Sequence, residues 1–337
     1  MKKLLLILSL AAVCCTTTVA ARGRGQAVIF ETDMGNDIDD AMALDLLFKN
    51  MDRGVIDLIG ISVHKNNPHA AEFIDIMRNW YGYRKVPIGI NTRCVTDTEC
   101  IDYATKVCRM TDADGRPLFA RSEKPKYEES VDMYRRLLAS QPDKSVVVIT
   151  VGFSTTMADL LRSGPDRHSK LSGRELVERK VKYFSVMAGE FTKENYAEYN
   201  VWNDAESARC FFDESPVPMV ITPFTIGTQI CYPGRSIAED FDWGRPHPMV
   251  EAYKAYAEMP YDRPTWDIIA ACYACIPDSD MFSLSDSGEV TVVGKGVTVF
   301  EPSAKGRYRI LDATPEQRQK ILRHFIRELT TKPRRMK

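Results

Sequence analysis

The sequence predicts an α/β protein built on a mostly parallel, doubly wound, Rossmann-like sheet with short extra strands near the C-terminus. Two observations carry this prediction. Strand and helix patterns alternate over the first 220 residues, which is typical of a parallel sheet covered by helices on both faces. Residues 145–151 form a continuous, mostly β-branched run, as expected of a central parallel strand buried on both sides.

The predicted elements follow one another in chain order. A short buried strand over 27–30 ends at an acidic cluster, and helical spacing follows over 41–48. The next strands are 55–63, 86–89, 145–151, 181–187 and 218–222, and the helices between them are 70–80, 127–139, 155–161 and 204–212. Residues 91–125 predict irregular structure. The last elements are a helix over 265–275, short strands within 289–300 and 307–310, and an amphipathic helix over 315–329.

Residues 1–21 have the pattern of a secretory signal peptide. A basic start precedes an apolar stretch over 4–15, and small residues at 18–21 offer a cleavage site. We therefore expect residues 22–337 to form a single exported domain, located in the periplasm. Lipid anchoring through Cys14 or Cys15 is the less favoured alternative, because the residue before such a cysteine should be small. The rest of the chain has no run of about 18 apolar residues, so we expect no membrane span.

Charge and cysteine content narrow the classes of partner. Removal of the signal peptide takes away two lysines and no acid, so the formal charge changes from −1 to −3. Basic residues cluster only in the tail at 332–337, which argues against a nucleic-acid partner. Cys94, Cys100 and Cys108 lie together in the predicted location of a disulfide. Cys272 and Cys275 fall in an apolar helical pattern, which favours core packing over a metal site.

Five carboxylates fall within the stretch Phe-Glu-Thr-Asp-Met-Gly-Asn-Asp-Ile-Asp-Asp-Ala at 30–41. They are Glu31, Asp33, Asp37, Asp39 and Asp40. Such crowding is costly unless the acids pair, become protonated or bind a cation. Hard cations such as calcium take six to eight oxygen ligands, so a bound cation is the favoured interpretation. Acids at a helix start explain only the last two.

Two other calcium or phosphate chemistries fit this stretch poorly. An EF-hand loop requires a glycine at its turn, where the chain has Ile38. A phosphotransferase of the haloacid-dehalogenase type requires a nucleophilic Asp where the chain has Glu31.

Two further segments are expected at the same edge of the sheet, because ligands bind beyond the carboxyl ends of parallel strands. One is the stretch 150–156, and the other follows Met187. In the latter, Asn195, Glu198 and Asn200 are suited to hydrogen-bonding sugar hydroxyls, whereas Asn203 or Asp204 is interpreted as a helix cap. Asp267, taken alone, is also better explained as a cap.

Together these stretches resemble the nucleoside hydrolase family of the inosine–uridine-preferring type. The family's opening motif, Asp-Thr-Asp-Pro-Gly-x-Asp-Asp-Ala, corresponds to residues 31–41 with two residues added. Further resemblances run in order along most of the chain: 86–89 to the family's third strand, 152–156 to Gly-Pro-Leu-Thr-Asn, 197–200 to Ala-Glu-Phe-Asn, and 266–267 to His-Asp. Several motifs in the same order are a specific signal.

The resemblance implies a calcium-dependent hydrolase of the N-glycosidic bond of nucleosides or related ribosides. The calcium ligands would be Asp33, Asp40, Asp267 and the backbone carbonyl of Thr155. Asp33 would also be the general base for a water held at the calcium. The ribose hydroxyls would be held by Asp39, Asn66, Glu198 and Asn200. Members of the family commonly form dimers or tetramers, so a homo-oligomer is compatible with it.

Four departures from the family pattern affect the site. The insertion leaves open whether Asp37 replaces Asp39 or joins it as a metal or substrate ligand. Glu31 lengthens an aspartate of the family. The family's sugar-binding Asn is replaced by Thr192, so Asn195 or Glu190 would substitute for it.

The fourth departure concerns the departing base. Trp266 stands at the family's leaving-group histidine, and an indole cannot act as a general acid at neutral pH. It would still contact the substrate. Tyr232, Tyr261 and His247 are nearby in the sequence and remain open as replacements.

Three functions compete on these grounds. The first is the hydrolysis of nucleosides, and the second is the hydrolysis of a non-nucleoside glycoside by the same fold. The third is a calcium-dependent sugar or nucleoside binding protein without efficient turnover. Release of free base separates the first from the other two, and binding without turnover marks the third.

Overall fold

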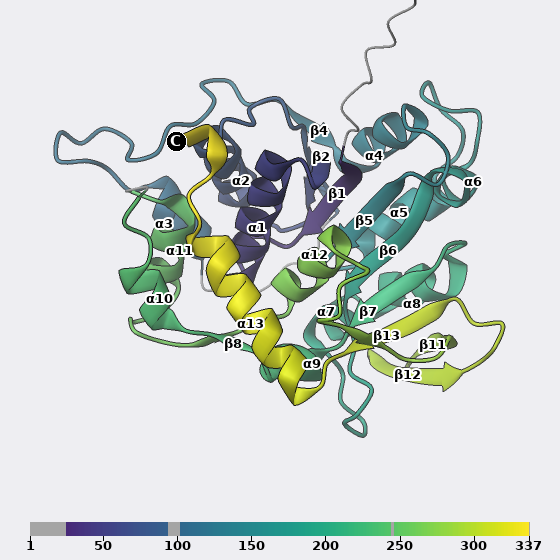
Figure 1. Ribbon diagram of the computed structural model, residues 1–337. Helices are drawn as coiled ribbons and strands as arrows, with labels where there is room; N and C mark the ends of the chain where they lie inside the picture. The colour runs from purple at the N-terminus through teal and green to yellow at the C-terminus, as the bar shows by residue number, and fades with distance from the viewer. Residues whose placement is uncertain (1–24, 94–101, 244–245, 337) are drawn as a thin grey trace, which may run out of the picture.

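The predicted doubly wound sheet is confirmed in the computed structural model, which describes residues 25–93, 102–243 and 246–336 (Figure 1). Within these residues the main sheet has 11 strands, in the order β12-β11-β13-β7-β6-β5-β1-β2-β3-β4, with β10 paired to β13. The strands of its parallel part are β1 (Gln26–Thr32), β2 (Ile56–Val63), β3 (Ile88–Ile90), β4 (Tyr127–Glu129), β5 (Val146–Thr150), β6 (Val181–Met187) and β7 (Met219–Thr222).

The C-terminal strands extend the sheet at one end. They are β10 (Ser283–Leu284), β11 (Gly288–Val293), β12 (Val297–Pro302) and β13 (Tyr308–Asp312). Strand β13 pairs parallel with β7, whereas β11 pairs antiparallel with both β12 and β13. A separate two-stranded ribbon joins β8 (Cys231–Tyr232) to β9 (Arg263–Pro264).

Helices cover both faces of the sheet. On the face seen in Figure 1 lie α1 (Asp39–Arg53), α2 (Pro68–Trp80), α3 (Tyr103–Cys108), α10 (Gly234–Glu239), α11 (Pro248–Tyr256), α12 (Asp267–Cys275) and α13 (Pro315–Thr330). On the opposite face lie α4 (Ser130–Ala139), α5 (Thr155–Arg162), α6 (Gly173–Lys180) and α8 (Ala205–Glu214). Short pieces complete the fold: α7 (Tyr199–Asn203), α9 (Phe224–Thr228) and a 3₁₀ turn (Arg334–Met336).

The sheet separates two hydrophobic cores. Because successive side chains of a strand point to opposite faces, Val28 and Phe30 enter the core under α1 and α12, while Ile29 enters the core under α4 and α5. Strand β5 alternates in the same way and is fully buried. The β-branched run therefore forms the central strand that its composition predicts.

Three local predictions differ from the structure. The predicted helix over 127–139 begins with an edge strand, since Tyr127 pairs parallel with Ile88 before α4 starts at Ser130. The stretch predicted to be irregular contains α3. Helices α6, α10 and α11 were not predicted, although Ser172 and Glu175 form a capping box at the start of α6.

Strand β1 lies at the topological switch point of the sheet. The chain builds β2, β3 and β4 on one side of β1, and then returns to place β5 on the other side. Ligands of doubly wound sheets bind outside the carboxyl ends of the strands at such a point. The acidic cluster follows β1 directly, so the fold brings it to this position.

The cysteines in the described part of the chain are free thiols. Cys272 and Cys275 are buried, unpaired thiols in the core beneath α12, as predicted from the apolar pattern. Cys108 is also unpaired, whereas Cys94 and Cys100 lie outside the described residues, as does the predicted signal peptide. Among the described helices, none is both long and apolar enough to cross a membrane.

Candidate active site

A cavity of about 240 Å³ opens at the carboxyl edge of the sheet. Its acidic wall comes from the β1–α1 loop, the segment after β6 and the start of α12. The acids that line it are Asp33, Asp37, Asp39, Asp40, Glu198 and Asp267. Sequence segments more than 200 residues apart therefore meet here, as the convergence of strand ends predicted.

Three of these acids have a buried oxygen without a hydrogen-bond partner within the described residues. They are Asp33 Oδ2, Asp39 Oδ1 and Asp40 Oδ2, and their residues are 3%, 0% and 1% exposed. The second oxygen of Asp40 accepts from the Thr32 hydroxyl. The second oxygen of Asp39 accepts from the backbone N–H groups of Trp266 and Asp267, at 2.6 and 2.8 Å.

Burial makes the charged forms of these acids unfavourable. It raises the pKa of Asp33, Asp40 and Asp267. Repulsion between neighbouring carboxylates adds to the rise for Asp40 and Asp267, whereas the nearby Lys65 opposes the rise for Asp33 without cancelling it. Burial and the charge of Asp37 raise the pKa of Asp39 to about 7. A cation among these oxygens would reverse the effect, since it favours the ionised forms. An all-oxygen donor set with unpartnered, buried oxygens fits a hard divalent cation.

The glycine at 152, in the segment after β5, lies against this wall. A Cβ atom added to Gly152 would stand 2.8 Å from Asp33 Oδ1 and from His64 Nε2. Only glycine leaves room for the β5–α5 segment to approach the cluster.

Besides Asp39, two predicted sugar ligands line the cavity, Glu198 and Asn200. Glu198 is 2% exposed and accepts from the N–H groups of Gly189, Asn200 and Val201, and burial raises its pKa to about 7. Asn200 donates through Nδ2 to the carbonyl of Val151, 3.0 Å away. These bonds fix both side chains at the cavity wall.

Other predicted ligands lie elsewhere. Asn66 lines a separate hollow, and Asn195 is exposed with a φ of 55°. Neither is among the described residues that line the main cavity, nor is Thr155, whose hydroxyl donates to Asp204 at 2.8 Å. Glu190 does not serve as a free sugar ligand, because its oxygens accept from Thr192 and from the Thr225 hydroxyl.

The remaining wall of the cavity is aromatic, and of its side chains the sequence predicted only Trp266. Trp266 stacks on Phe224 with ring centroids 5.6 Å apart, and its indole Nε1–H donates to the Phe224 carbonyl at 2.9 Å. Arg263 lines the cavity beside them and forms a two-point ion pair with Asp37. Its guanidinium carbon lies 4.9 Å from the ring centre of Tyr256. Nothing in the sequence pattern singles out Phe224, Tyr256 or Arg263.

The three residues left open as leaving-group acids are placed away from the cavity. Tyr232 bonds to the Ser236 hydroxyl, and Tyr261 donates to the carbonyl of Tyr253. His247 is buried beneath α1, and burial lowers its pKa well below the usual value. The described residues that line the cavity include none of these three.

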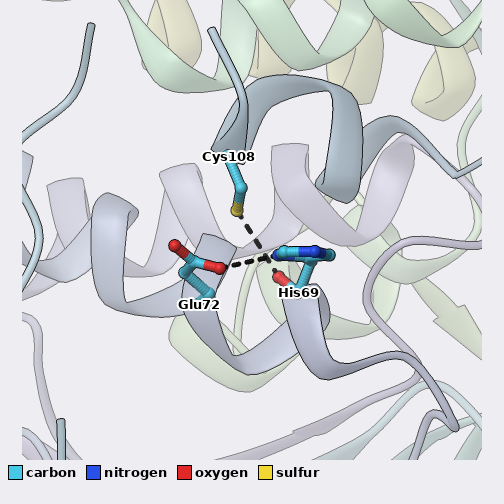
Figure 2. A group of neighbouring side chains, drawn as sticks. All are labelled: His69, Glu72 and Cys108. Atoms are coloured by element: carbon cyan, nitrogen blue, oxygen red, sulfur yellow. Dashed lines mark hydrogen bonds and ion pairs between the residues drawn. The ribbon is translucent and has the colours of Figure 1, made fainter. Parts of the chain in front are cut away.

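A second group of candidate metal ligands, His69, Glu72 and Cys108, joins α2 to α3 (Figure 2). Its carboxylate is already neutralised. Glu72 accepts from His69 Nδ1 at 2.7 Å and pairs with Arg121, which also donates to the Cys108 carbonyl. The Cys108 thiol lies 3.7 Å from the His69 carbonyl oxygen. We therefore assign this group to helix packing and not to a metal centre.

The fold and the cavity together define a doubly wound α/β protein with an acidic, oxygen-rich pocket at the carboxyl edge of its sheet. Residues 28–328 match the family described as inosine-uridine preferring nucleoside hydrolase, and the chain belongs to this family. It is accordingly a nucleosidase, a hydrolase of N-glycosyl bonds.

Solved structures agree with this assignment at the level of the fold. A plant nucleoside hydrolase is 20% identical with a TM-score of 0.67, covering 91% of this chain and 99% of its own. An inosine-uridine preferring nucleoside hydrolase from Bacillus anthracis is 16% identical with a TM-score of 0.65, covering 90% and 99%. A purine-preferring ribonucleoside hydrolase from Gardnerella vaginalis is 15% identical with a TM-score of 0.67, covering 90% and 98%. No curated protein matches the sequence.

Proposed function

We propose that this nucleosidase is calcium-dependent and uses Asp33 as its general base. The observation that carries the proposal is the set of buried carboxylate oxygens without partners on Asp33, Asp39 and Asp40. In their ionised form, buried carboxylates of this kind require a compensating positive charge. Calcium suits them because every candidate ligand is an oxygen.

The proposed ligands are Asp33, Asp40, Asp267 and the backbone carbonyl of Thr155. Three carboxylates line the cavity, and the Gly152 backbone lies against Asp33, which brings the start of α5 close to the cluster. Calcium bound there would lower the pKa of a water molecule and orient it toward the sugar. Asp37 is engaged by Arg263, so we leave it out of the ligand set.

The protein groups supply the remaining chemistry. Asp33 accepts the proton of the attacking water, and Glu198, Asn200 and Asp39 hold the ribose hydroxyls. The carboxylates around the sugar stabilise the positive charge that develops at its anomeric carbon. Asn66 and Asn195 would join this set only if substrate binding drew their segments toward the cavity.

Calcium titration of the mature protein, followed by a reducing-sugar assay on a panel of nucleosides, tests this proposal. We expect one calcium-binding event and release of free base. Asp40→Asn should abolish the heat of calcium binding in the titration. It should keep the fold, because an amide oxygen still accepts from the Thr32 hydroxyl. Asp286→Asn, an exposed acid outside the site, is the matched control. If no divalent cation binds, the calcium mechanism is overturned.

A second candidate is a calcium-held riboside binding protein without efficient turnover. The presence of Trp266 in place of a protonating histidine favours it. Calcium binding together with tight nucleoside binding and no base release would support this candidate over the first.

We also propose that a signal peptide at 1–21 directs the protein to the periplasm, leaving 22–337 as one domain, and that this domain forms a homo-oligomer. The apolar stretch after a basic start supports export. The resemblance to a family whose members commonly form dimers or tetramers supports assembly. Mass spectrometry of the N-terminus of protein recovered from the periplasm tests the first point. Light scattering of the same material tests the second.

A further inference from the structure

We propose that Arg263, aligned by Asp37, stabilises the departing base during hydrolysis. The inference rests on the proposed function of the cavity and assigns to it the leaving-group residue that the sequence does not reveal. Arg263 is the catalytic residue in this account, and Asp37 is a positioning residue.

Cleavage of the glycosidic bond creates a demand for positive charge on the side of the base. The bond between the anomeric carbon and the base nitrogen breaks, and its electron pair stays on the base. Water adds to the anomeric carbon and gives its proton to Asp33. The base anion later takes a proton from solvent and Asp33 releases its proton to solvent, so the products are free sugar and neutral base.

Trp266 cannot meet this demand. An indole N–H donates a hydrogen bond but is not an acid at neutral pH. Its Nε1–H is also already used, because it donates to the Phe224 carbonyl at 2.9 Å. The ring provides a stacking surface, with the Phe224 ring parallel to it within 22°. Another group must therefore supply the charge.

Arg263 has the required placement. Among the described residues that line the cavity it is the one that is always cationic, and it stands beside the aromatic wall where a base would stack. Its guanidinium carbon is 5.3 Å from the ring centre of Trp266 and 4.9 Å from that of Tyr256. A guanidinium has five N–H groups, and Asp37 engages those of Nε and Nη2, so donors remain for a ligand.

Asp37 explains why the arginine is held there. It belongs to the two residues inserted in the family's opening motif, Asn36 and Asp37, and it also accepts from the N–H of Asp39 at 3.2 Å. A carboxylate that accepts two hydrogen bonds from one guanidinium fixes the orientation of the guanidinium plane. One arrangement thus accounts for two departures from the family pattern, the insertion and the lost histidine.

The experiment compares two substrates that differ in the help their leaving groups need. Inosine has a poor leaving group, whereas 4-nitrophenyl riboside releases a stable anion without assistance. We expect Arg263→Gln to lower kcat/KM for inosine by about 10²- to 10³-fold, the usual cost of removing one preorganised donor. For 4-nitrophenyl riboside the loss should stay below about 5-fold. Arg263→Lys should fall between the parent and Arg263→Gln on inosine.

Asp37→Asn should show the same dependence on substrate with a smaller loss on inosine. The double variant should lose no more than Arg263→Gln alone, since Asp37 acts through the arginine. Arg235→Gln removes an exposed arginine that pairs with Glu239 through its Nε at 2.8 Å, and it serves as the matched control. Thermal melting and calcium titration report whether each variant keeps its fold and its cation site.

Equal losses on both substrates would overturn the inference, because they would indicate a general disturbance of the site. A selective loss in Tyr256→Phe without one in Arg263→Gln would overturn it as well and would assign the role to the phenol. If the parent protein cleaves neither substrate, the proposed function itself fails, which is a separate and recognisable result.

Discussion

Helix α1 carries two sets of buried acids that differ in how their charge is balanced. At its first turn, Asp39 and Asp40 each keep one oxygen without a partner among the described residues. About one and a half turns later, Asp45 Oδ1 accepts from the Tyr81 hydroxyl. Its Oδ2 also has no hydrogen-bond partner among the described residues, but it forms an ion pair with Lys49 at 2.9 Å. Lys49 also donates to the Leu329 carbonyl. The three acids and Lys49 are all almost fully buried.

The two sets of acids on α1 therefore have different functions: the set at the first turn is suited to binding a ligand, and the set in the middle of the helix is structural. In the middle of the helix, an internal cation accompanies the acid, so the pair joins α1 to α13 and needs nothing from outside. At the start of the helix the charge is balanced less completely. Lys65 acts on Asp33 and Arg263 acts on Asp39, yet the pKa of both acids stays raised, as does that of Asp40. The acids there lower the stability of the folded state until a ligand compensates them.

The largest expected effect is on turnover. Asp33→Asn should lower kcat for nucleoside hydrolysis by about 10³-fold, because the amide cannot accept the proton of water. Thermal stability in the absence of calcium should stay the same or rise, since one buried charge is lost. Stopped assays combined with calorimetric melting check both. A melting temperature that falls together with activity would place Asp33 in the structural class of Asp45.

In the middle of α1 we expect a loss of stability without a loss of activity. Lys49→Met should cost about 3 to 5 kcal/mol of unfolding free energy, because it leaves Asp45 buried without its cation. Urea unfolding measures this cost, while kcat of the folded fraction should not change. Adding Asp45→Asn to Lys49→Met should recover part of the loss. A destabilisation with no such recovery would contradict the pairing account.

Calcium should stabilise the protein through the acids around the first turn of α1 and not through the Asp45–Lys49 pair. At 100 times the dissociation constant, a ligand that binds only the folded state adds about 2.7 kcal/mol. Chelation with EDTA should therefore lower the melting temperature of the parent protein. Asp40→Asn should melt at one temperature with or without EDTA, and Lys49→Met should keep the full calcium response.

The smallest effect concerns pH. Burial, and then the charge of Lys49, lower the pKa of His247 well below its usual value of 6.5. The unfolded chain therefore binds a proton below about pH 6.5 that the folded protein excludes, so stability falls as the pH falls through this range. We expect a loss of up to about 1.4 kcal/mol per pH unit from this group. His247→Gln should reduce the slope in urea unfolding between pH 7.5 and 5.5, and an unchanged slope would contradict the assignment.

The sequence predicts the parts of this molecule that are set by local pattern. The strand before Glu31, the acids after it and the α12 start at Asp267 are contiguous motifs, so their chemistry can be read before their positions are known. The ends of parallel strands then bring them together. The placement of Glu198 and Asn200 follows the same rule.

The unpredicted parts depend on contacts between distant segments. Arg263 meets Asp37 across 226 residues, and no periodicity encodes that meeting. The Trp266 ring is accommodated by packing on Phe224 and by the absence of a side chain at Gly227, which the ring contacts closely. Strand β4 is only three residues long and lies at the sheet edge, where pairing partner and not composition decides its conformation.

The bonds from Trp266 and Asp267 to Asp39 span 227 and 228 residues. They make the order of synthesis relevant to function. While the chain emerges from the ribosome, the acid cluster is complete by residue 40, but its opposite wall is made only after about four-fifths of the chain. A product truncated before residue 260 would carry every acid of the opening motif and hydrolyse nothing. Nucleoside hydrolysis therefore requires that the chain has been synthesised past Asp267 and that the start of α12 has packed against the acids after β1.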